Sequence, residues 1–131
     1  MISKSYISVL CFVLFLSQID SACIKNIQVQ LVIESGFEVS SKSYSIASGS
    51  NVIQLLEIDH VLSTSDSHGY GPYVDAIDGV FAYWVPNQQF WLLLVNSVPS
   101  QLSASNYILK ANDVITWRIV AYDPITMADF K

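Results

Sequence analysis

Alternation of apolar and polar positions is the clearest pattern along the chain. In residues 26–34 (NIQVQLVIE), isoleucine, valine and leucine alternate with glutamine, and residues 114–122 (VITWRIVAY) alternate in the same way. A period of two is that of a strand with one buried face. Both segments are therefore predicted to be half-buried strands. Shorter strands are predicted over three further ranges, 42–47, 73–77 and 90–95.

One segment has apolar positions at helical spacing. In residues 51–62 (NVIQLLEIDHVL), valine and leucine recur at intervals of three and four residues, as they do on the buried side of an amphipathic helix. Ser50 precedes this run and is the expected N-cap, because its hydroxyl can accept a bond from a free backbone N–H. Residues 63–71 are polar and are predicted to form a flexible loop.

The order of these elements predicts an α+β fold. Two strands, one helix and then several strands are typical of one helix laid on a mixed or antiparallel sheet, in a β-grasp-like arrangement. Residues 90–95 (FWLLLV) are apolar on both faces of their strand, which calls for cover on both sides. A single helix covers one face. The other face must meet a second layer formed by the C-terminal strands, a partner or a ligand.

The N-terminus has the pattern of a secretory signal peptide. Residues 1–22 carry an early Lys4, an apolar run over residues 7–16, and small residues at the end. That apolar run is too short to span a bilayer core of about 30 Å. We expect cleavage after Ala22, which leaves residues 23–131 as one exported, soluble domain. Cys23 is then its one cysteine, so no internal disulfide is expected.

The charge of the chain restricts its partners. The formal net charge is −5, and the six lysines and arginines are scattered. Without a basic stripe to neutralise phosphates, nucleic acid and anionic membrane surfaces are unfavourable partners. We therefore expect a ligand that is neutral or apolar, or else a protein.

Catalytic and metal-binding patterns are weak. The chain lacks a Gly-x-Ser-x-Gly motif, and no cysteine stands where a base could activate it. Asp75 and Asp78 are an odd number of positions apart on a predicted strand, so their side chains should project to opposite faces as solvated acids. Four residues could approach one another around the predicted loop, although their spacing matches no recognised metal site: Asp59, His60, Asp66 and His68. We expect neither enzymatic activity nor a bound metal or cofactor.

The segment HGYGPYVDAIDG, residues 68–79, has two interpretations. Gly69 and Gly71 permit a close approach of the backbone, and Pro72 fixes its own backbone torsion. The segment is either a turn that only reverses the chain or a ledge for a flat ligand.

Four segments taken in order resemble one known family: SGSNVIQLLE (48–57), YGPYVDAIDGV (70–80), QFWLLLVN (89–96) and ANDVITWRIVAY (111–122). They are similar to the C-terminal β-domain of the cobalamin carriers transcobalamin, intrinsic factor and haptocorrin, over about residues 27–122. In these carriers the β-domain covers one side of the corrin. The resemblance implies ligand contacts at seven positions: Gly71, Pro72, Tyr73, Val74, Trp91, Leu93 and Leu94.

The resemblance implies a secreted, non-enzymatic module that binds cobalamin or another corrinoid. The carriers' helical α/α-barrel domain has no counterpart in this sequence, so the module is expected to form half of a site. A separate helical domain or a second copy would complete that site. The alternative is a secreted protein-interaction domain that keeps the fold without binding cobalamin. Tyr73 and Trp91 would then be core aromatics.

Export is the first testable prediction. Protein recovered from the medium or periplasm should begin at Cys23, because the signal peptide is removed after Ala22. N-terminal sequencing of exported protein measures this directly. Protein that keeps Met1 and stays in the cytoplasm would contradict the assignment.

Overall fold

The structure, a computed structural model, describes residues 25–66, 69 and 71–123. The expected signal peptide, Cys23 and His68 lie outside the described residues.

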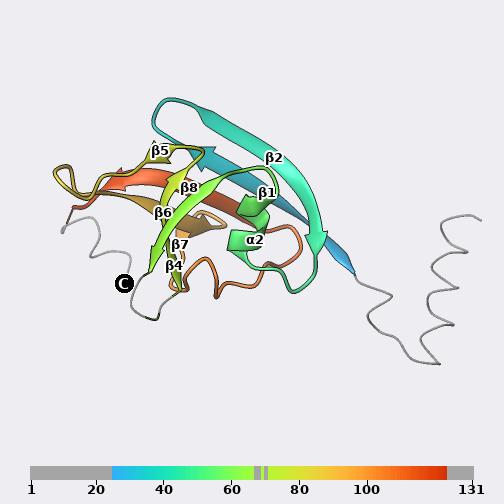
Figure 1. The fold of residues 1–131 in the computed structure, drawn as a ribbon. Coiled ribbons are helices and arrows are strands. Elements are labelled where there is room, and N and C mark those ends of the chain that lie inside the picture. Colours follow the sequence, from blue (N-terminus) through green and yellow to red (C-terminus); the bar gives the residue numbers. More distant parts are fainter. Residues whose placement is uncertain (1–24, 67–68, 70, 124–131) are drawn as a thin grey trace, which may run out of the picture.

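The larger of two sheets has five strands in the order β2-β1-β8-β6-β7 (Figure 1). The strands are β1 (Asn26–Glu34), β2 (Val39–Ala47), β6 (Gln89–Val95), β7 (Val98–Pro99) and β8 (Val114–Ala121). β1 and β8 are parallel and the other neighbours are antiparallel, so the sheet is mixed. The N-terminal and C-terminal strands thus lie side by side at its centre.

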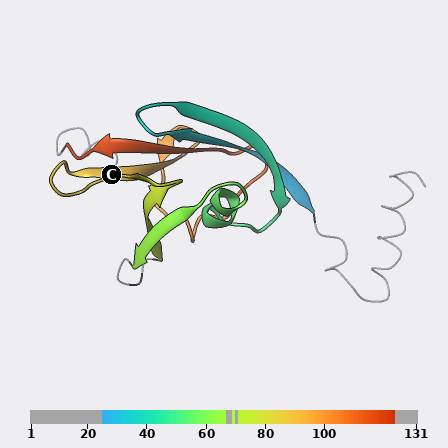
Figure 2. The same cartoon turned by 45° about the horizontal axis from the view of Figure 1, so that its top comes forward.

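A smaller antiparallel sheet packs with the helix against the larger one. It has the order β3-β4-β5, from β3 (Leu62–Asp66), β4 (Pro72–Ile77) and β5 (Val80–Phe81). Figure 2 shows this small sheet and helix α2 (Val52–Glu57) on the same side of the five-stranded sheet. We call that side the inner face. The expected α+β class is confirmed, with two sheets where a single one was expected.

The inner face carries the alternating residues identified in the sequence. Val29, Leu31 and Ile33 of β1 are buried, and so are Ile115 and Trp117 of β8. They pack in one core cluster with residues of α2 and β4. A fully buried aliphatic side chain stabilises the fold by about 1.5–3 kcal/mol relative to an exposed one. The predicted half-buried strands are therefore confirmed.

The helix is shorter than expected and begins one residue later. Its N-cap is Asn51, whose side chain accepts from the Gln54 N–H at 2.8 Å, while the Gln54 side chain accepts from the Asn51 N–H at 2.8 Å. The assignment of Ser50 as the cap was wrong, because its hydroxyl donates to the Ala47 carbonyl at 2.7 Å instead. The helix ends at Glu57, and the chain soon enters β3.

The predicted loop at residues 63–71 contains most of β3, so that prediction was wrong for residues 63–66. Residues Ser63 to Asp66 are exposed. The strand is held by antiparallel pairing with β4 rather than by burial of its side chains. A strand of this kind has no apolar alternation for a sequence pattern to reveal.

The two apolar faces of β6 have different surroundings. Trp91 and Leu93 point to the inner face and belong to the core cluster. The small sheet and α2 form the second layer that covers them. The C-terminal strand β8 does not form that layer, because it pairs with β6 in the same sheet. Leu94 is also buried, yet it lies outside that cluster.

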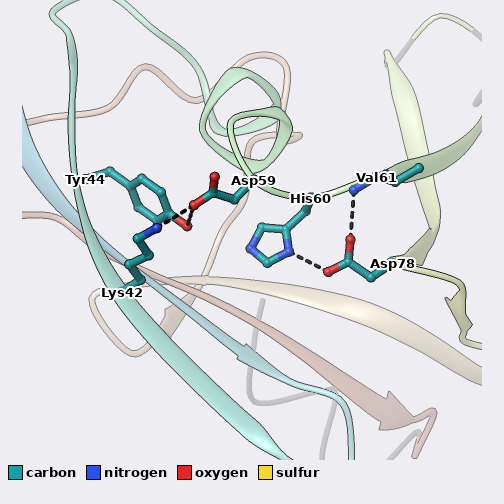
Figure 3. A network of polar contacts seen from close by, with 6 residues as sticks. All are labelled: Lys42, Tyr44, Asp59, His60, Val61 and Asp78. Carbon is teal, nitrogen blue, oxygen red and sulfur yellow. Dashed lines mark hydrogen bonds and ion pairs between the residues drawn. The ribbon is translucent and has the colours of Figure 1, made fainter.

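Two aspartates tie the end of the helix to both sheets (Figure 3). Asp59 accepts from Lys42 Nζ and from the Tyr44 hydroxyl, both at 2.8 Å, which fixes the helix end to β2. The hydrogen bonds from Lys42 and Tyr44 hold the pKa of Asp59 below its usual range. Burial and the bond to Asp59 raise the pKa of Tyr44 to about 12.

Asp78 makes the second tie, at the turn between β4 and β5. Its carboxylate lies 2.6 Å from His60 Nδ1 and accepts from the Val61 N–H at 2.8 Å (Figure 3). Burial acts to raise the pKa of Asp78, but the hydrogen bonds from His60 and Val61 outweigh it and lower the pKa. The chain leaving the helix is therefore held between β2 and the small sheet.

Candidate functional site

An open cavity of about 260 Å³ lies between β4 and the inner face of β6 and β8. One wall is Pro72, Tyr73 and Val74 of β4, and the opposite wall includes Trp91 and Leu93 of β6. Pro72 and Tyr73 are exposed at its mouth, whereas Val74, Trp91 and Leu93 are buried. The cavity therefore has an apolar interior that opens to solvent beside β4.

Trp117 of β8 and the irregular residues 102–104 complete the lining. The sequence predicted the strand that carries Trp117 only as half-buried, and it did not indicate the segment 102–104. That segment follows β7 without a regular repeat, so no periodic signal could have revealed it. It reaches the cavity through tertiary contacts alone.

The start of the helix holds this segment in place. The Val52 N–H donates to the Ala104 carbonyl at 3.0 Å, and Asn51 Nδ2 donates to the Ser105 carbonyl at 3.3 Å. Backbone N–H groups at a helix N-terminus have no partner inside the helix. Here two of them, those of Val52 and Ile53, and the N-cap side chain position a wall of the cavity.

A buried carboxylate, that of Asp113, holds the chain that follows this segment. Asp113 accepts from the Tyr107 hydroxyl at 2.9 Å, from the Lys110 N–H at 2.9 Å and from Asn96 Nδ2 at 3.0 Å. Burial and the bond to Asp113 raise the pKa of Tyr107 to about 12. The phenol therefore stays protonated and keeps donating at neutral pH.

Polar atoms are few inside the cavity. The indole N–H of Trp91 donates to the Val80 carbonyl at 3.2 Å. Within the described part of the chain, Trp117 Nε1 is a buried side-chain nitrogen with no hydrogen-bond partner. Burial and the nearby Asp75 carboxylate raise the pKa of Tyr73, so its hydroxyl is protonated at neutral pH. The cavity can hold a neutral, mostly apolar group with few polar contacts.

Five of the seven predicted ligand-contact residues line this one cavity: Pro72, Tyr73, Val74, Trp91 and Leu93. The structure does not bring the other two into it. Leu94 is buried away from the inner-face cluster. Gly71 has φ +91° and packs against Ser105, because a Cβ at this position would lie 2.3 Å from Ser105 Oγ. The backbone at Gly71 therefore lies close to Ser105 of the same chain.

The other sequence candidates have partners within the fold. His60 contacts Asp78, and Asp75 accepts from the Ser65 hydroxyl at 3.2 Å. Among residues 25–66, 69 and 71–123, no three or more histidines, cysteines or acids form a group that could hold a metal ion. No helix among these residues is long and apolar enough to cross a membrane.

A second surface, which the sequence did not indicate, lies at the opposite end of β4. Phe81 and Tyr83 stack with ring centroids 5.9 Å apart, and Trp84 meets Tyr122 edge to face at 5.9 Å. All four side chains are exposed. A cavity of about 390 Å³ opens beside Phe81 and Tyr83 and reaches Phe37 in the β1–β2 turn. We call these five residues the aromatic group.

The fold of this chain also occurs as part of a larger protein. The structure resembles haptocorrin in complex with Cbi, with a TM-score of 0.67 and 20% identity over 76% of this chain and 26% of that chain. The chain thus spans about a quarter of the haptocorrin chain. The expected resemblance to the cobalamin carriers is confirmed at the level of the fold.

Residues 49–121 match the family described as "Domain of unknown function (DUF4430)", and the chain belongs to this family. A second similar structure is described as "a putative metal binding protein" from Ruminococcus gnavus ATCC 29149. It has a TM-score of 0.59 and 15% identity over 76% of this chain and 99% of that chain. No curated protein sequence matches the chain.

The packing of Gly71 generates a stability prediction. Gly71→Ala should lower the free energy of unfolding more than Gly69→Ala does. Both glycines have φ +91°, but a Cβ at Gly69 meets no atom within 4 Å. Backbone strain alone costs roughly 1–2 kcal/mol, and the Ser105 contact adds to it at position 71. Urea denaturation of the two variants measures the difference.

Ser105→Ala supplies the control for this prediction. Removing Ser105 Oγ should restore part of the free energy of unfolding that Gly71→Ala loses. It should restore none of the free energy of unfolding that Gly69→Ala loses. Equal losses for Gly69→Ala and Gly71→Ala would contradict the close packing.

Proposed function

We propose that the chain is a non-enzymatic binding module for a flat, neutral ligand, and that cobalamin or another corrinoid is that ligand. The observation that carries the proposal is the cavity itself. Its walls come from residues 72–74 and from Trp91 and Leu93, which are distant in sequence and face each other across an apolar opening. The similar haptocorrin structure is a complex with Cbi, which supports a corrinoid over other flat ligands.

The cavity is proposed to be half of a site. Burial of roughly 300 Å² of apolar ligand surface would contribute about 7 kcal/mol. With an association cost of about 4 kcal/mol, the affinity of this half alone is in the millimolar range. Useful binding then needs a second surface, from a separate helical domain or a second copy.

Two further features belong to the proposal. We propose that the domain is exported after removal of residues 1–22. We also propose that its fold is β-grasp-like, because α2 crosses a mixed sheet whose central pair, β1 and β8, is parallel.

A second candidate function is that of a protein-interaction domain. The exposed aromatic group favours it, since aromatic side chains are enriched where proteins meet. That group lies at the opposite end of β4 from the cavity, so substitutions can address the two functions separately.

Tyr73 supplies the decisive variant for corrinoid binding. Tyr73→Ala should weaken cobalamin binding about tenfold, because the loss of roughly 60 Å² of apolar contact costs about 1.5 kcal/mol. Equilibrium dialysis at millimolar cobalamin measures the affinity. Because the Tyr73 side chain is 42% exposed, the melting temperature should change little.

Phe81→Ala is the matched control. Phe81 is 44% exposed and lies outside the cavity, so its variant should bind cobalamin as the parent does. Leu93→Ala is a poorer probe, since Leu93 is buried in the core and its truncation should cost about 2–5 kcal/mol of stability. Equal binding by the parent and Tyr73→Ala, or no binding by the parent, would refute the corrinoid proposal. A loss of partner binding confined to Phe81→Ala would favour the interaction domain.

A further inference from the structure

The outer edges of the two sheets differ in how they are protected. β7 and β5 are only two residues long, and β7 ends in Pro99. β3 pairs with β4 through a register shift between Ser63 and Thr64. Short strands, prolines and bulges are features that keep the edge of a sheet from pairing with another chain. Within the described part of the chain, three of the four sheet edges therefore carry such a feature.

The fourth edge, β2, has none of these features (Figure 1). It is nine residues long, contains no proline and pairs with β1 in continuous register over its whole length. Lysine side chains also protect edges, but the Lys42 Nζ lies 2.8 Å from the Asp59 carboxylate of the same chain. No strand of the described residues pairs with the outer side of β2. β2 is thus a long edge that is open to another strand.

The hydrogen bonds to β1 determine which backbone groups of β2 point outward. At one end of the ladder, the Ser48 N–H donates to the Lys25 carbonyl at 2.8 Å. At the other end, the Ser35 N–H donates to the Glu38 carbonyl at 3.2 Å. Residues that bond to the neighbouring strand alternate with residues that do not in an antiparallel pair. The even-numbered residues of β2 therefore bond to β1, and the odd-numbered residues direct their N–H and C=O groups away from it.

We propose that two copies of this chain pair antiparallel along β2, with the two-fold axis at Ser43, so that their five-stranded sheets join into one. Ser43 is the central residue of β2 and one of those that point outward, so this register pairs all nine residues of each strand. The Ser43 N–H of each copy donates to the Ser43 carbonyl of the other. Ser41 of one copy and Ser45 of the other exchange the same two bonds on either side.

The side chains of β2 are complementary to themselves in this register. Opposite residues are placed symmetrically about position 43, so Lys42 faces Tyr44 of the second copy and Ser41 faces Ser45. Lys42 is the one charged residue of the strand, and it has no like charge directly opposite, which would destabilise the pair. Opposed serines can hydrogen-bond to each other across the strands. This complementarity favours a second copy over an unrelated chain.

The interface is small, and it is separate from the cavity. Nine residues from each copy are fewer than the roughly 20–30 residues a side of a stable interface. We therefore expect a reversible dimer that forms at high protein concentration. β1 and β8 lie between β2 and β6, so the cavity beside β4 stays open in the dimer. The pairing can occur whether or not the cavity binds a corrinoid.

Engineered cysteines test the register. Opposed residues of a bonded antiparallel pair have Cα atoms about 5.5 Å apart, which a disulfide can span. With Cys11→Ser and Cys23→Ser in place, Ser43→Cys should oxidise to a covalent dimer in a yield that rises with protein concentration. Ser45→Cys is the matched control. Its two cysteines would lie four residues apart along the paired strands, about 14 Å, and should not bridge. Non-reducing electrophoresis measures both yields.

Proline at the axis tests the backbone bonds. Ser43→Pro removes an outward N–H and no bond to β1, and proline is tolerated on edge strands, so the monomer should fold. Its self-association should weaken about tenfold or more, because both bonds at the axis are lost. Ser43→Thr keeps the N–H and should associate as the parent does. Sedimentation equilibrium measures the three association constants.

The cysteine pair gives the answer if Ser43→Pro does not fold. Three results would each overturn the inference: a parent that stays monomeric at millimolar concentration, equal disulfide yields for Ser43→Cys and Ser45→Cys, or a folded Ser43→Pro that associates as the parent does.

Discussion

The inner face of the five-stranded sheet is wider than the one helix that packs on it. Strands lie about 4.8 Å apart, and a helix rises about 1.5 Å per residue. Helix α2 has six residues, so it spans roughly 9 Å, whereas the five strands are about 19 Å wide. The apolar residues of β6 and β8 that the helix does not reach must find other cover. The small sheet supplies it, and the cavity lies where this cover is incomplete.

The same helix also sets the shape of the opening. Its first N–H and its N-cap side chain bind the carbonyls of Ala104 and Ser105, so the segment that closes one side of the cavity is fixed to a core element. Asp113 anchors the chain that follows this segment through hydrogen bonds from Tyr107 and Lys110, and a third hydrogen bond links Asp113 to Asn96 after β6. A site built in this way is largely formed before a ligand arrives, which reduces the ordering cost of binding.

The strands could be predicted from the sequence where buried and exposed residues alternate along them. β1 buries one face, and β8 buries Ile115 and Trp117 on the same side with Thr116 also buried between them; the period of two of both strands was visible in the sequence. β3 is held by pairing and exposes most of its side chains, so it looked like a loop. The helix cap is Asn51 and not Ser50 because the Asn51 side chain accepts from the Gln54 N–H. The Ser50 hydroxyl donates back to the Ala47 carbonyl, a contact that exists only in the folded turn.

The candidate site was predictable only in part. Family resemblance, not local pattern, indicated Pro72, Tyr73, Val74, Trp91 and Leu93, and the fold does place them around one cavity. Gly71 was interpreted through its conformational freedom, which its φ of +91° supports, but only the structure shows that Ser105 is its neighbour.

The central claim is that the cavity beside β4 binds a corrinoid. A correlation spectrum of the isotope-labelled protein, titrated with cobalamin to millimolar concentration, tests it most directly because it locates weak binding. If the cavity binds a corrinoid, saturable shifts should be confined to residues 72–74, 91–93, 102–104 and 117, with the signals of Phe81 and Tyr83 unchanged. Shifts centred on the aromatic group, or none at all, would contradict it.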